Sequence, residues 1–234
     1  MRRVVRPELL DHLPASAPWA MRSRADLRRL NRVMGHARII NEAFYEHLDM
    51  ETARVRSLRV CELGAGDGAL LLELARSWAA LGVTAEAELI DLHYLMTEET
   101  RGAFMELGWH ATPVALDVMT WLNRSSERVD VMLANLFLHH FEDAPLRALF
   151  QRIAARTCLF IACEPRRSAF AWTASHFVGA IGCNPVTRHD APVSVRAGFA
   201  NRELSSLWPE PEAWQISEAS AGLFSHCFIA RRYA

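Results

Sequence analysis

Residues 61–75, CELGAGDGALLLELA, place three alternating glycines between a short apolar run and a leucine-rich segment. The run at 58–63 predicts a buried strand, and residues 69–80 predict a helix that stops near Gly82. Glycines at a strand-to-helix turn let the backbone approach a ligand closely, because they lack a Cβ atom. The stretch therefore predicts a ligand-binding turn in an α/β fold.

Strands and helices alternate along the middle of the chain. Four more apolar runs follow the glycine stretch, and helical segments separate them; Asp143 is expected to cap one of these, with Pro145 in its first turn. This alternation favours a parallel sheet covered by helices on both faces. The expected strands are 85–91, 112–117, 129–135 and 158–164, with a helix at 97–107.

The end of the chain departs from this alternation. Residues 213–219 and 223–232 predict two strands that only a few residues around Gly222 join. A parallel pair needs a longer crossover, so these strands must run antiparallel. The sequence therefore predicts a doubly wound, Rossmann-like α/β fold whose seven-stranded sheet ends in an antiparallel C-terminal β-hairpin.

The N-terminal part predicts helix. Apolar residues recur at near-helical spacing across 22–48, where Ser23 and Asp26 fit a capping box. We expect residues 1–50 to form a helical segment of their own, followed by the main domain at 51–234. The arginines expected on its solvated face are Arg28, Arg29 and Arg32.

Composition excludes several classes of protein. All 26 basic residues are arginine, so the chain has no P-loop, Schiff-base or kinase lysine. The net charge of −1 creates no global attraction for polyanions. The five cysteines are scattered without a C-x-x-C pair, which argues against zinc and favours reduced thiols in the cytoplasm. The arginine-rich N-terminus lacks the apolar core of a signal peptide, and no run is long enough to span a bilayer, so we expect neither feature.

Two classes of cofactor use a glycine turn of this kind. Gly64, Gly66 and Ala69 satisfy the G-x-G-x-x-G/A pattern of dinucleotide folds. However, Glu62 precedes the glycines, Gly68 completes a G-x-G-x-G run, and the sheet is expected to end in a hairpin. These features, with an acidic residue after the third strand, resemble the class I S-adenosylmethionine (SAM)-dependent methyltransferases over residues 58–232.

The resemblance assigns the cofactor-binding residues. It implies that Asp91 holds both ribose hydroxyls, that Asp117 contacts the adenine amino group, and that Asn135 lies beside the methionine end. On their own, Asp91 and Asp117 are equally well explained as caps of the helices that follow them. The residues implied to contact SAM, or its product S-adenosylhomocysteine, are Glu62, Gly64, Ala65, Gly66, Gly68, Asp91, Leu92, Asp117, Val118, Asn135 and Leu136.

The segment NLFLHHFED, at 135–143, limits the classes of molecule that can be the methyl acceptor. It lacks the N/D-P-P-Y/F motif of base-modifying relatives, and Asn135 stands where catechol-type enzymes carry a metal-binding carboxylate. It resembles small-molecule methyltransferases, and 184–199 resembles a bacterial group associated with polyketide and phenolic-lipid pathways. The resemblance implies metal-independent O-methylation of a small hydrophobic, phenolic or polyketide-type metabolite in bacterial secondary metabolism, with no nucleic acid partner.

Two segments are expected to build the acceptor site. In the family, an N-terminal segment such as 1–50 commonly folds over the cofactor as a lid, and the insert at 165–212 is the second wall. Histidine is the natural base for a phenol at neutral pH. His139 is expected to act as a base or to orient the acceptor, and His189 to act as a base oriented by Asp190; otherwise each is a structural histidine. The residues expected to line the acceptor site are Met34, His140, His176 and Arg188.

Other functions stay open at this point. An RNA or protein methyltransferase would use the N-terminal arginines as a phosphate-binding patch. A non-catalytic subunit would bind SAM without turnover, and a nicotinamide oxidoreductase would use the same glycine turn. The sequence does not indicate an oligomeric state.

Overall fold

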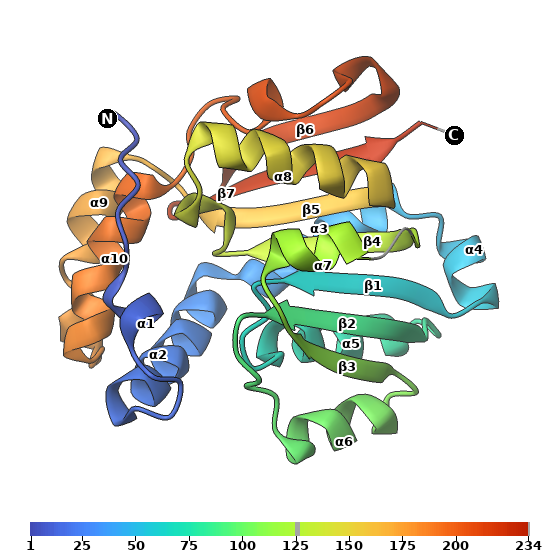
Figure 1. Cartoon of the computed structure of the whole chain (residues 1–234), viewed down its shortest axis with the longest axis horizontal. Helices are drawn as coiled ribbons and strands as arrows, with labels where there is room; N and C mark the ends of the chain where they lie inside the picture. The colour runs from blue at the N-terminus through green and yellow to red at the C-terminus, as the bar shows by residue number, and fades with distance from the viewer. Residues whose placement is uncertain (125–126, 234) are drawn as a thin grey trace.

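The computed structural model describes residues 1–124 and 127–233 (Figure 1). A seven-stranded sheet with the strand order β3-β2-β1-β4-β5-β7-β6 forms its centre. The first five strands are parallel, and β7 runs antiparallel to both β5 and β6. The strands are β1 Leu58–Leu63, β2 Ala85–Asp91, β3 His110–Ala115, β4 Val129–Asn135, β5 Thr157–Pro165, β6 Trp214–Ala221 and β7 Ser225–Arg232. The predicted fold is therefore confirmed.

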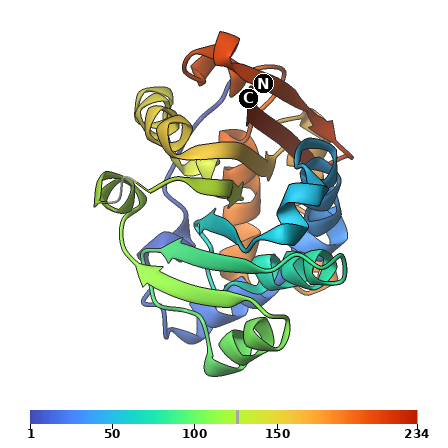
Figure 2. The ribbon, with the colours of Figure 1, turned by 90° about the vertical axis from the view of Figure 1, so that its right-hand side faces the viewer.

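Helices cover both faces of this sheet, as Figure 2 shows. They are α1 Leu9–His12, α2 Pro18–Met34, α3 His36–His47, α4 Met50–Val55, α5 Ala69–Ala79, α6 Glu98–Glu106, α7 Val118–Arg124, α8 Asp143–Arg156, α9 Ala169–Ser175 and α10 Pro185–Ala197. Four short 3₁₀ turns are η1 Leu138–His140, η2 Val178–Ile181, η3 Ser205–Leu207 and η4 Pro211–Ala213. The parallel strands lie between α3 and α5 on one face and α7 and α8 on the other.

Alternating strand residues feed two cores. Val60 faces the core that α3 and α5 complete, where Phe44 stacks on Trp78 with 3.7 Å between the ring centroids. Cys61, one residue further, faces the core under α8, which holds Phe150. Because successive strand side chains point to opposite faces, one apolar strand serves both cores.

The N-terminal helix differs from the prediction at both ends. It begins at Pro18 and ends at Gly35, whose φ of 71° breaks the predicted 22–48 helix into α2 and α3. The capping-box prediction is wrong, because Ser23 and Asp26 lie buried inside α2. Proline at the first helical position fits the helix start, since its missing N–H has no intrahelical partner there.

Two other predicted boundaries shift by a few residues. The third strand ends at Ala115 instead of residue 117, so Asp117 belongs to the turn before α7. Asp143 is the first residue of α8, and its predecessor Glu142 occupies the cap position without a side-chain hydrogen bond. The apolar Leu116 continues the strand pattern in sequence; its N–H still donates to the carbonyl of Asp91 in β2 at 2.9 Å, but the residue itself is in a bend.

Helices α1, α2, α9 and α10 gather beside the carboxyl ends of the parallel strands (Figure 1). Asp190 of α10 accepts hydrogen bonds from the backbone N–H groups of Leu9 (2.8 Å) and Leu10 (3.0 Å). Ser23 Oγ lies 2.8 Å from Thr187 Oγ1, which joins α2 to α10. The N-terminal segment and the insert thus form one layer over the strand ends.

The predicted lid at 1–50 does not all lie in this layer. Helix α3 belongs to the core of the sheet, where Ile40 and Phe44 are fully buried. A covering role is therefore a proposal for the residues up to Met34, and the division at residue 50 stays a prediction. Among the described residues, we find no helix that is both long and apolar enough to cross a membrane.

Candidate functional site

The glycine turn between β1 and α5 requires glycine for two physical reasons. Gly64, Gly66 and Gly68 all have positive φ, at 68°, 57° and 78°. A Cβ atom on Gly64 would lie 2.5 Å from Cδ2 of Phe137, whereas one on Gly66 would meet no atom within 4 Å. The turn is therefore tight against the polypeptide at Gly64 and open at Gly66, where a ligand can approach the backbone.

Hydrogen bonds attach this turn to the end of β2. The N–H groups of Gly64 and Ala65 donate to the carbonyl of Ile90 at 2.9 and 3.0 Å. The N–H of Gly66 donates to Oδ2 of Asp91 at 3.0 Å. Asp91 is thereby fixed beside the open side of the turn, as a ribose-binding carboxylate needs to be.

Glu62 and Asn135 each hold a buried side-chain oxygen without a partner among the described residues. Glu62 is 2% exposed, and burial, together with the nearby carboxylates of Asp67 and Asp91, raises its pKa to about 8. Such a group is stabilised by a cation or a hydrogen-bond donor. The unpartnered oxygens therefore fit the cationic amino acid end of SAM.

Asp117 caps α7, as the alternative interpretation predicted. Its Oδ1 accepts hydrogen bonds from the N–H of Thr120 (2.9 Å) and from the Thr120 hydroxyl (3.2 Å). Asp91 is no helix cap, because it bonds the N–H groups of Gly66 and His93. Capping occupies one oxygen of Asp117, so adenine recognition by its carboxylate stays a prediction.

A cavity of about 880 Å³ extends from the glycine turn to the covering layer. That volume lies within the usual range for small-molecule sites. Of the predicted cofactor residues, those that line it are Gly64, Gly66, Asp91, Leu92, Asp117, Val118 and Leu136. Glu62, Ala65, Gly68 and Asn135 lie outside its lining. Its far side is mainly apolar, with Leu27 and Leu30 from α2 and Ala174 and Val178 from the insert.

The predicted acceptor residues divide into two groups. Met34 and His140 line the cavity. His176 and Arg188 are exposed and outside its lining, and so is His189, whose side chain is 51% exposed. Nδ1 of His189 does lie 2.8 Å from Oδ1 of Asp190, and Asp190 lines the cavity, but His189 itself lies outside the lining, so the geometry does not support His189 as the base.

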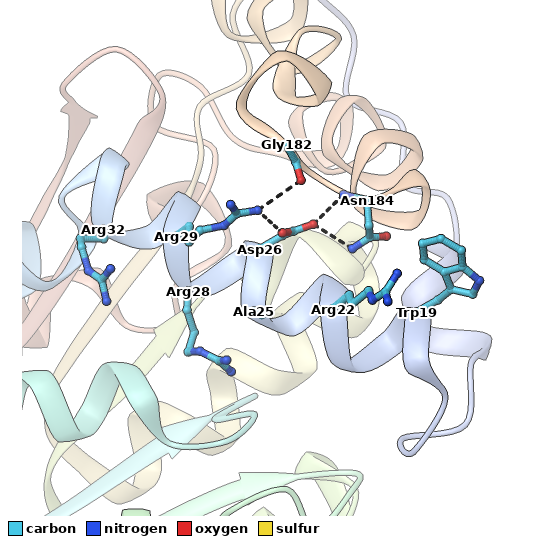
Figure 3. Close-up of a pocket in the computed structure, with 9 residues that line it drawn as sticks. All are labelled: Trp19, Arg22, Ala25, Asp26, Arg28, Arg29, Arg32, Gly182 and Asn184. Atoms are coloured by element: carbon cyan, nitrogen blue, oxygen red, sulfur yellow. Dashed lines mark hydrogen bonds and ion pairs between the residues drawn. The ribbon is translucent and has the colours of Figure 1, made fainter.

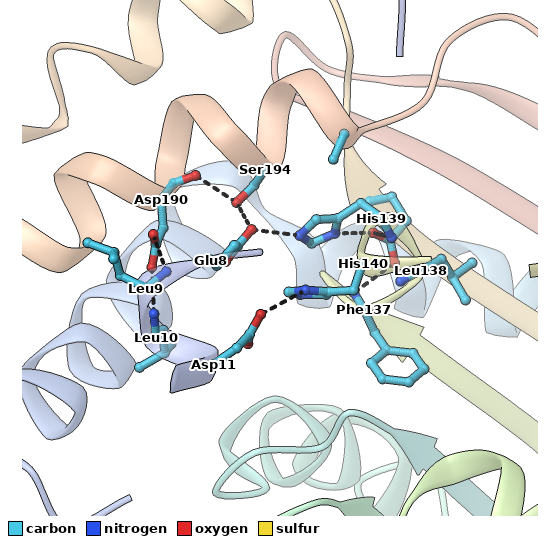
Figure 4. A network of polar contacts seen from close by, with 12 residues as sticks. Glu8, Leu9, Leu10, Asp11, Phe137, Leu138, His139, His140, Asp190 and Ser194 are labelled. Carbon is cyan, nitrogen blue, oxygen red and sulfur yellow. Dashed lines mark hydrogen bonds and ion pairs between the residues drawn. The ribbon is translucent and has the colours of Figure 1, made fainter. Parts of the chain in front are cut away.

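His139 lies between two carboxylates, that of Glu8, which is labelled in Figure 4, and that of Glu164. Its Nδ1 is 2.7 Å from Oε2 of Glu164, and its Nε2 is 3.2 Å from Oε1 of Glu8. Burial alone would lower the pKa of His139, but the hydrogen bonds to Glu164 and Glu8 outweigh burial and raise it to about 9. His139 is 3% exposed and lines the cavity.

Glu164 is held rigidly beneath His139. It is fully buried at the end of β5, and it accepts the backbone N–H groups of Phe137 (2.9 Å), Leu138 (2.8 Å) and His139 (3.3 Å). Leu136, with a φ of 51°, turns the chain so that these groups face Glu164. A left-handed backbone is unfavourable for leucine, so the hydrogen bonds to Glu164 stabilise a strained turn.

Glu8 reaches this cluster from the N-terminal segment. Its Oε1 accepts a hydrogen bond from the hydroxyl of Ser194 and lies beside His139. Although burial alone would raise the pKa of Glu8, the hydrogen bond to His139 holds it below its usual value. Next to this pair, Oδ2 of Asp11 lies 3.4 Å from Nδ1 of His140.

The same cluster has a spacing that a metal ion could use. One ligand atom each from Glu8, His139 and His140 lies within 4.8 Å of the others. Two imidazoles and a carboxylate suit several divalent transition metals. The expectation of a metal-independent reaction stays a prediction, and the experiments below address it.

Comparison with known proteins identifies a family for the part of the chain that contains the glycine turn. Residues 60–157 match the model of a methyltransferase domain family. The matched span is less than half of the chain, and together with the strand order it identifies a methyltransferase domain on a Rossmann-like methyltransferase fold. The matched span of this methyltransferase contains the glycine turn, Asp91, Asp117, Asn135 and the His139 turn, but neither Glu8 nor the insert.

Solved structures resemble the methyltransferase in fold. The plantazolicin methyltransferase BamL, in complex with a triazolic desmethylPZN analog and S-adenosylhomocysteine, has 11% identity and a TM-score of 0.63 over 96% of this chain and 93% of its own. The pyocyanin biosynthetic protein PhzM has 13% identity and a TM-score of 0.60, and the match covers 97% of this chain and 62% of PhzM. An O-methyltransferase family protein from Burkholderia thailandensis has 16% identity and a TM-score of 0.55 over 92% and 58%, so the methyltransferase spans little more than half of that chain. No curated protein matches it significantly.

The sequence identified only part of the polar cluster in this methyltransferase. His139 was expected at the site, and Glu164 was placed at the end of its strand. Glu8 and Ser194 were not expected, because Glu8 contacts a histidine 131 positions away. The only local hint was that Glu8 precedes a short apolar stretch in a segment that the family resemblance already assigns to the lid.

Proposed function

We propose that the methyltransferase transfers the methyl group of SAM to an oxygen atom of a small hydrophobic acceptor, with a phenol as the favoured class. The observation that carries this proposal is that one cavity of about 880 Å³ is lined by the glycine turn, by His139 and by apolar side chains of the covering layer. A reaction between two bound molecules needs both ends in one enclosed space.

Each end of the cavity has residues suited to one partner. The glycine turn and Asp91 hold the nucleoside side of the cofactor. Glu62 and Asn135 lie behind the cavity lining, and a bridging water would link their unpartnered oxygens to the amino acid end of the cofactor. SAM supplies a methyl group on a positively charged sulfur, which is a good leaving group. The protein then has to orient the acceptor oxygen and exclude water, which alone supplies large effective molarities of about 10⁵–10⁸ M.

The acceptor end favours a molecule that is apolar with one polar group. Leucines of α1 and α2 and alanines of the insert face the cavity, while the polar side chains of Glu8 and Ser194 form a hydrogen-bonded cluster with His139 in its wall. This pattern suits a ring or chain with one hydroxyl directed at the histidine. Similarity to BamL and PhzM, named for plantazolicin methylation and pyocyanin biosynthesis, supports a role in bacterial secondary metabolism.

We also propose a cytoplasmic location. The five cysteines are free in the described structure, and burial raises the pKa values of the thiols at Cys61 and Cys163 well above the ordinary value. Free, unpaired thiols suit a reducing compartment.

The arginine groove on α2 carries the competing proposal of an RNA acceptor. Arg22, Arg28, Arg29 and Arg32 line a groove of about 660 Å³ with Trp19 (Figure 3). Arg28, however, pairs with Asp67 of the glycine turn, and Arg29 pairs with Asp26 and reaches the carbonyl of Gly182. Two of the four arginines therefore already hold the covering layer in place, which weakens this alternative.

The experiment uses SAM with a trideuterated methyl group and a bacterial lysate separated into organic, RNA and protein fractions. Label in the organic fraction is the expected result, and the mass of the product begins to identify the acceptor. Label in RNA or protein would refute the small-molecule proposal. Calorimetry with S-adenosylhomocysteine separates a catalytic failure from a loss of cofactor binding, because a non-catalytic subunit binds the product and labels no fraction.

A further inference from the structure

The hydrogen bonds around His139 determine its protonation state. Ionised carboxylates accept hydrogen bonds and cannot donate them. Both ring nitrogens of His139 face carboxylate oxygens, at 2.7 Å and 3.2 Å. With both carboxylates ionised, each nitrogen carries a hydrogen, in agreement with the raised pKa of His139, and His139 is an imidazolium while Glu8 lies against it. An imidazolium cannot take a further proton, so His139 in this arrangement is no general base.

The two carboxylates differ in whether an oxygen atom is still available to an acceptor molecule. Glu164 is fully buried and accepts three backbone N–H groups besides His139, which leaves it no access to an acceptor molecule. Glu8 lines the cavity. In the part of the chain that the structure describes, the hydrogen bonds to the Glu8 side chain all end on Oε1, from His139 and Ser194. Its Oε2 remains able to accept a proton.

We propose that Glu8, carried on the N-terminal segment, is the general base of the methyl transfer, and that His139 is the cation that positions it and keeps it ionised. This inference rests on the proposed function. In the step, the O–H bond of the acceptor breaks and its proton passes to Oε2 of Glu8. The acceptor oxygen forms its bond to the methyl carbon, while the carbon–sulfur bond of the cofactor breaks and its electron pair stays on sulfur.

A carboxylate is a sufficient base for this reaction. As the new carbon–oxygen bond forms, the acceptor hydroxyl becomes far more acidic than the free phenol, because positive charge develops on its oxygen. The proton then moves downhill to a carboxylate even though Glu8 has a lowered pKa. The titratable groups that face His139 are Glu8 from the N-terminal segment, Glu164 from β5 and the neighbouring His140 of η1, with Asp11 and Asp190 in the layer around them.

The first test compares Glu8→Gln with a matched control. Gln keeps the size of the side chain but removes the proton acceptor. Asp143→Asn is the control, because Asp143 pairs with Arg3 and so helps to anchor the same N-terminal segment, while its own side chain is exposed and outside the cavity lining. With the acceptor isolated by deuterium labelling, we expect Glu8→Gln to lower kcat by about 10²–10⁴-fold. S-adenosylhomocysteine affinity should stay within about twofold, Asp143→Asn should retain kcat, and Glu8→Asp should recover part of it.

The second test observes His139 directly and needs no acceptor. Histidine ring nitrogens labelled with ¹⁵N distinguish the imidazolium from the neutral ring, and the His139→Gln variant identifies the signals of this residue. We expect His139 to be doubly protonated at pH 7.5 in the wild-type protein and to lose its proton at a lower pH in Glu8→Gln.

Three results would overturn the proposal. One is a kcat for Glu8→Gln within about threefold of wild type, and another is a neutral His139 at pH 7.5 in the wild-type protein. The third is loss of wild-type activity with a chelator and its return with Zn²⁺ or Mn²⁺, which would assign Glu8, His139 and His140 to a metal. If the wild-type protein labels no fraction at all, the proposed function fails instead, and the ring-nitrogen spectrum still reports independently on Glu8 and His139.

Discussion

Deprotonation of His139 should destabilise the folded protein by an amount that the structure lets us calculate. The pKa of His139 rises from 6.5 to about 9 in the folded chain. Each unit corresponds to 1.36 kcal/mol, so the bonds to Glu164 and Glu8 contribute about 3 kcal/mol to the free energy of unfolding. Because the folded pKa is the higher one, this contribution is fully present below pH 6.5 and is lost as the pH rises through about 9.

Urea unfolding of wild type and Glu8→Gln between pH 6 and pH 10 measures this effect. Wild type should lose about 3 kcal/mol from His139 over that range, and the variant should lose less, since only Glu164 still faces the ring. Glu62, whose pKa burial raises to about 8, also costs stability over the same range, but it does so equally in both proteins and cancels in the difference. Parallel pH curves for the two proteins would refute the reasoning, because they would mean that Glu8 does not stabilise the imidazolium.

Three further predictions concern single residues. Gly64→Ala should lower the free energy of unfolding by about 1–3 kcal/mol and weaken S-adenosylhomocysteine binding in calorimetry, because φ of Gly64 is 68° and the new Cβ would lie 2.5 Å from the ring of Phe137. The control is Gly82→Ala, whose new Cβ would meet no atom within 4 Å. In thermal unfolding this control should show only the cost of the left-handed backbone. Asp91→Ala should weaken binding of S-adenosylhomocysteine by at least about tenfold, since a charge-assisted hydrogen bond is worth about 1.5–3 kcal/mol; undiminished binding in calorimetry contradicts the ribose assignment. His189→Ala should retain kcat in the labelling assay, because this side chain is 51% exposed and outside the cavity, and a tenfold loss would restore it as a base.

The sheet could be predicted from the sequence because its signals are local. Each parallel strand is a short apolar run, and the few residues around Gly222 allow only an antiparallel hairpin. The ends of the strands and helices were less predictable. In β3, for example, Leu116 extends the apolar pattern beyond Ala115, the last residue that pairs with β2. The break at Gly35 depends on a left-handed glycine whose effect the surrounding helical periodicity conceals.

The polar cluster around His139 shows why adjacent residues in the sequence are a poor guide to which side chains meet in the fold. His189 and Asp190 are adjacent and looked like an oriented base, but adjacent helix residues lie on different faces. Asp190 points inward to the N–H groups of Leu9 and Leu10, and His189 points outward. The carboxylates that face His139, Glu164 and Glu8, lie 25 and 131 positions away from it in the sequence, so no local spacing rule could have paired them with this histidine.

The position of Glu8 has a consequence for when the site can react. The segment that carries it is fixed by the side chain of Arg3, which bonds the carbonyls of Phe141 (2.7 Å) and Ala197 (2.8 Å), and by Asp190, which holds the start of α1. If Glu8 is the base, the proton acceptor exists only while this segment covers the cavity. The same closure removes water from the space where the methyl group moves, so the reactive arrangement and the dry cavity form together. SAM bound in an open site would then face His139 without Glu8, and the protein would hold its activated methyl group without a base to use it.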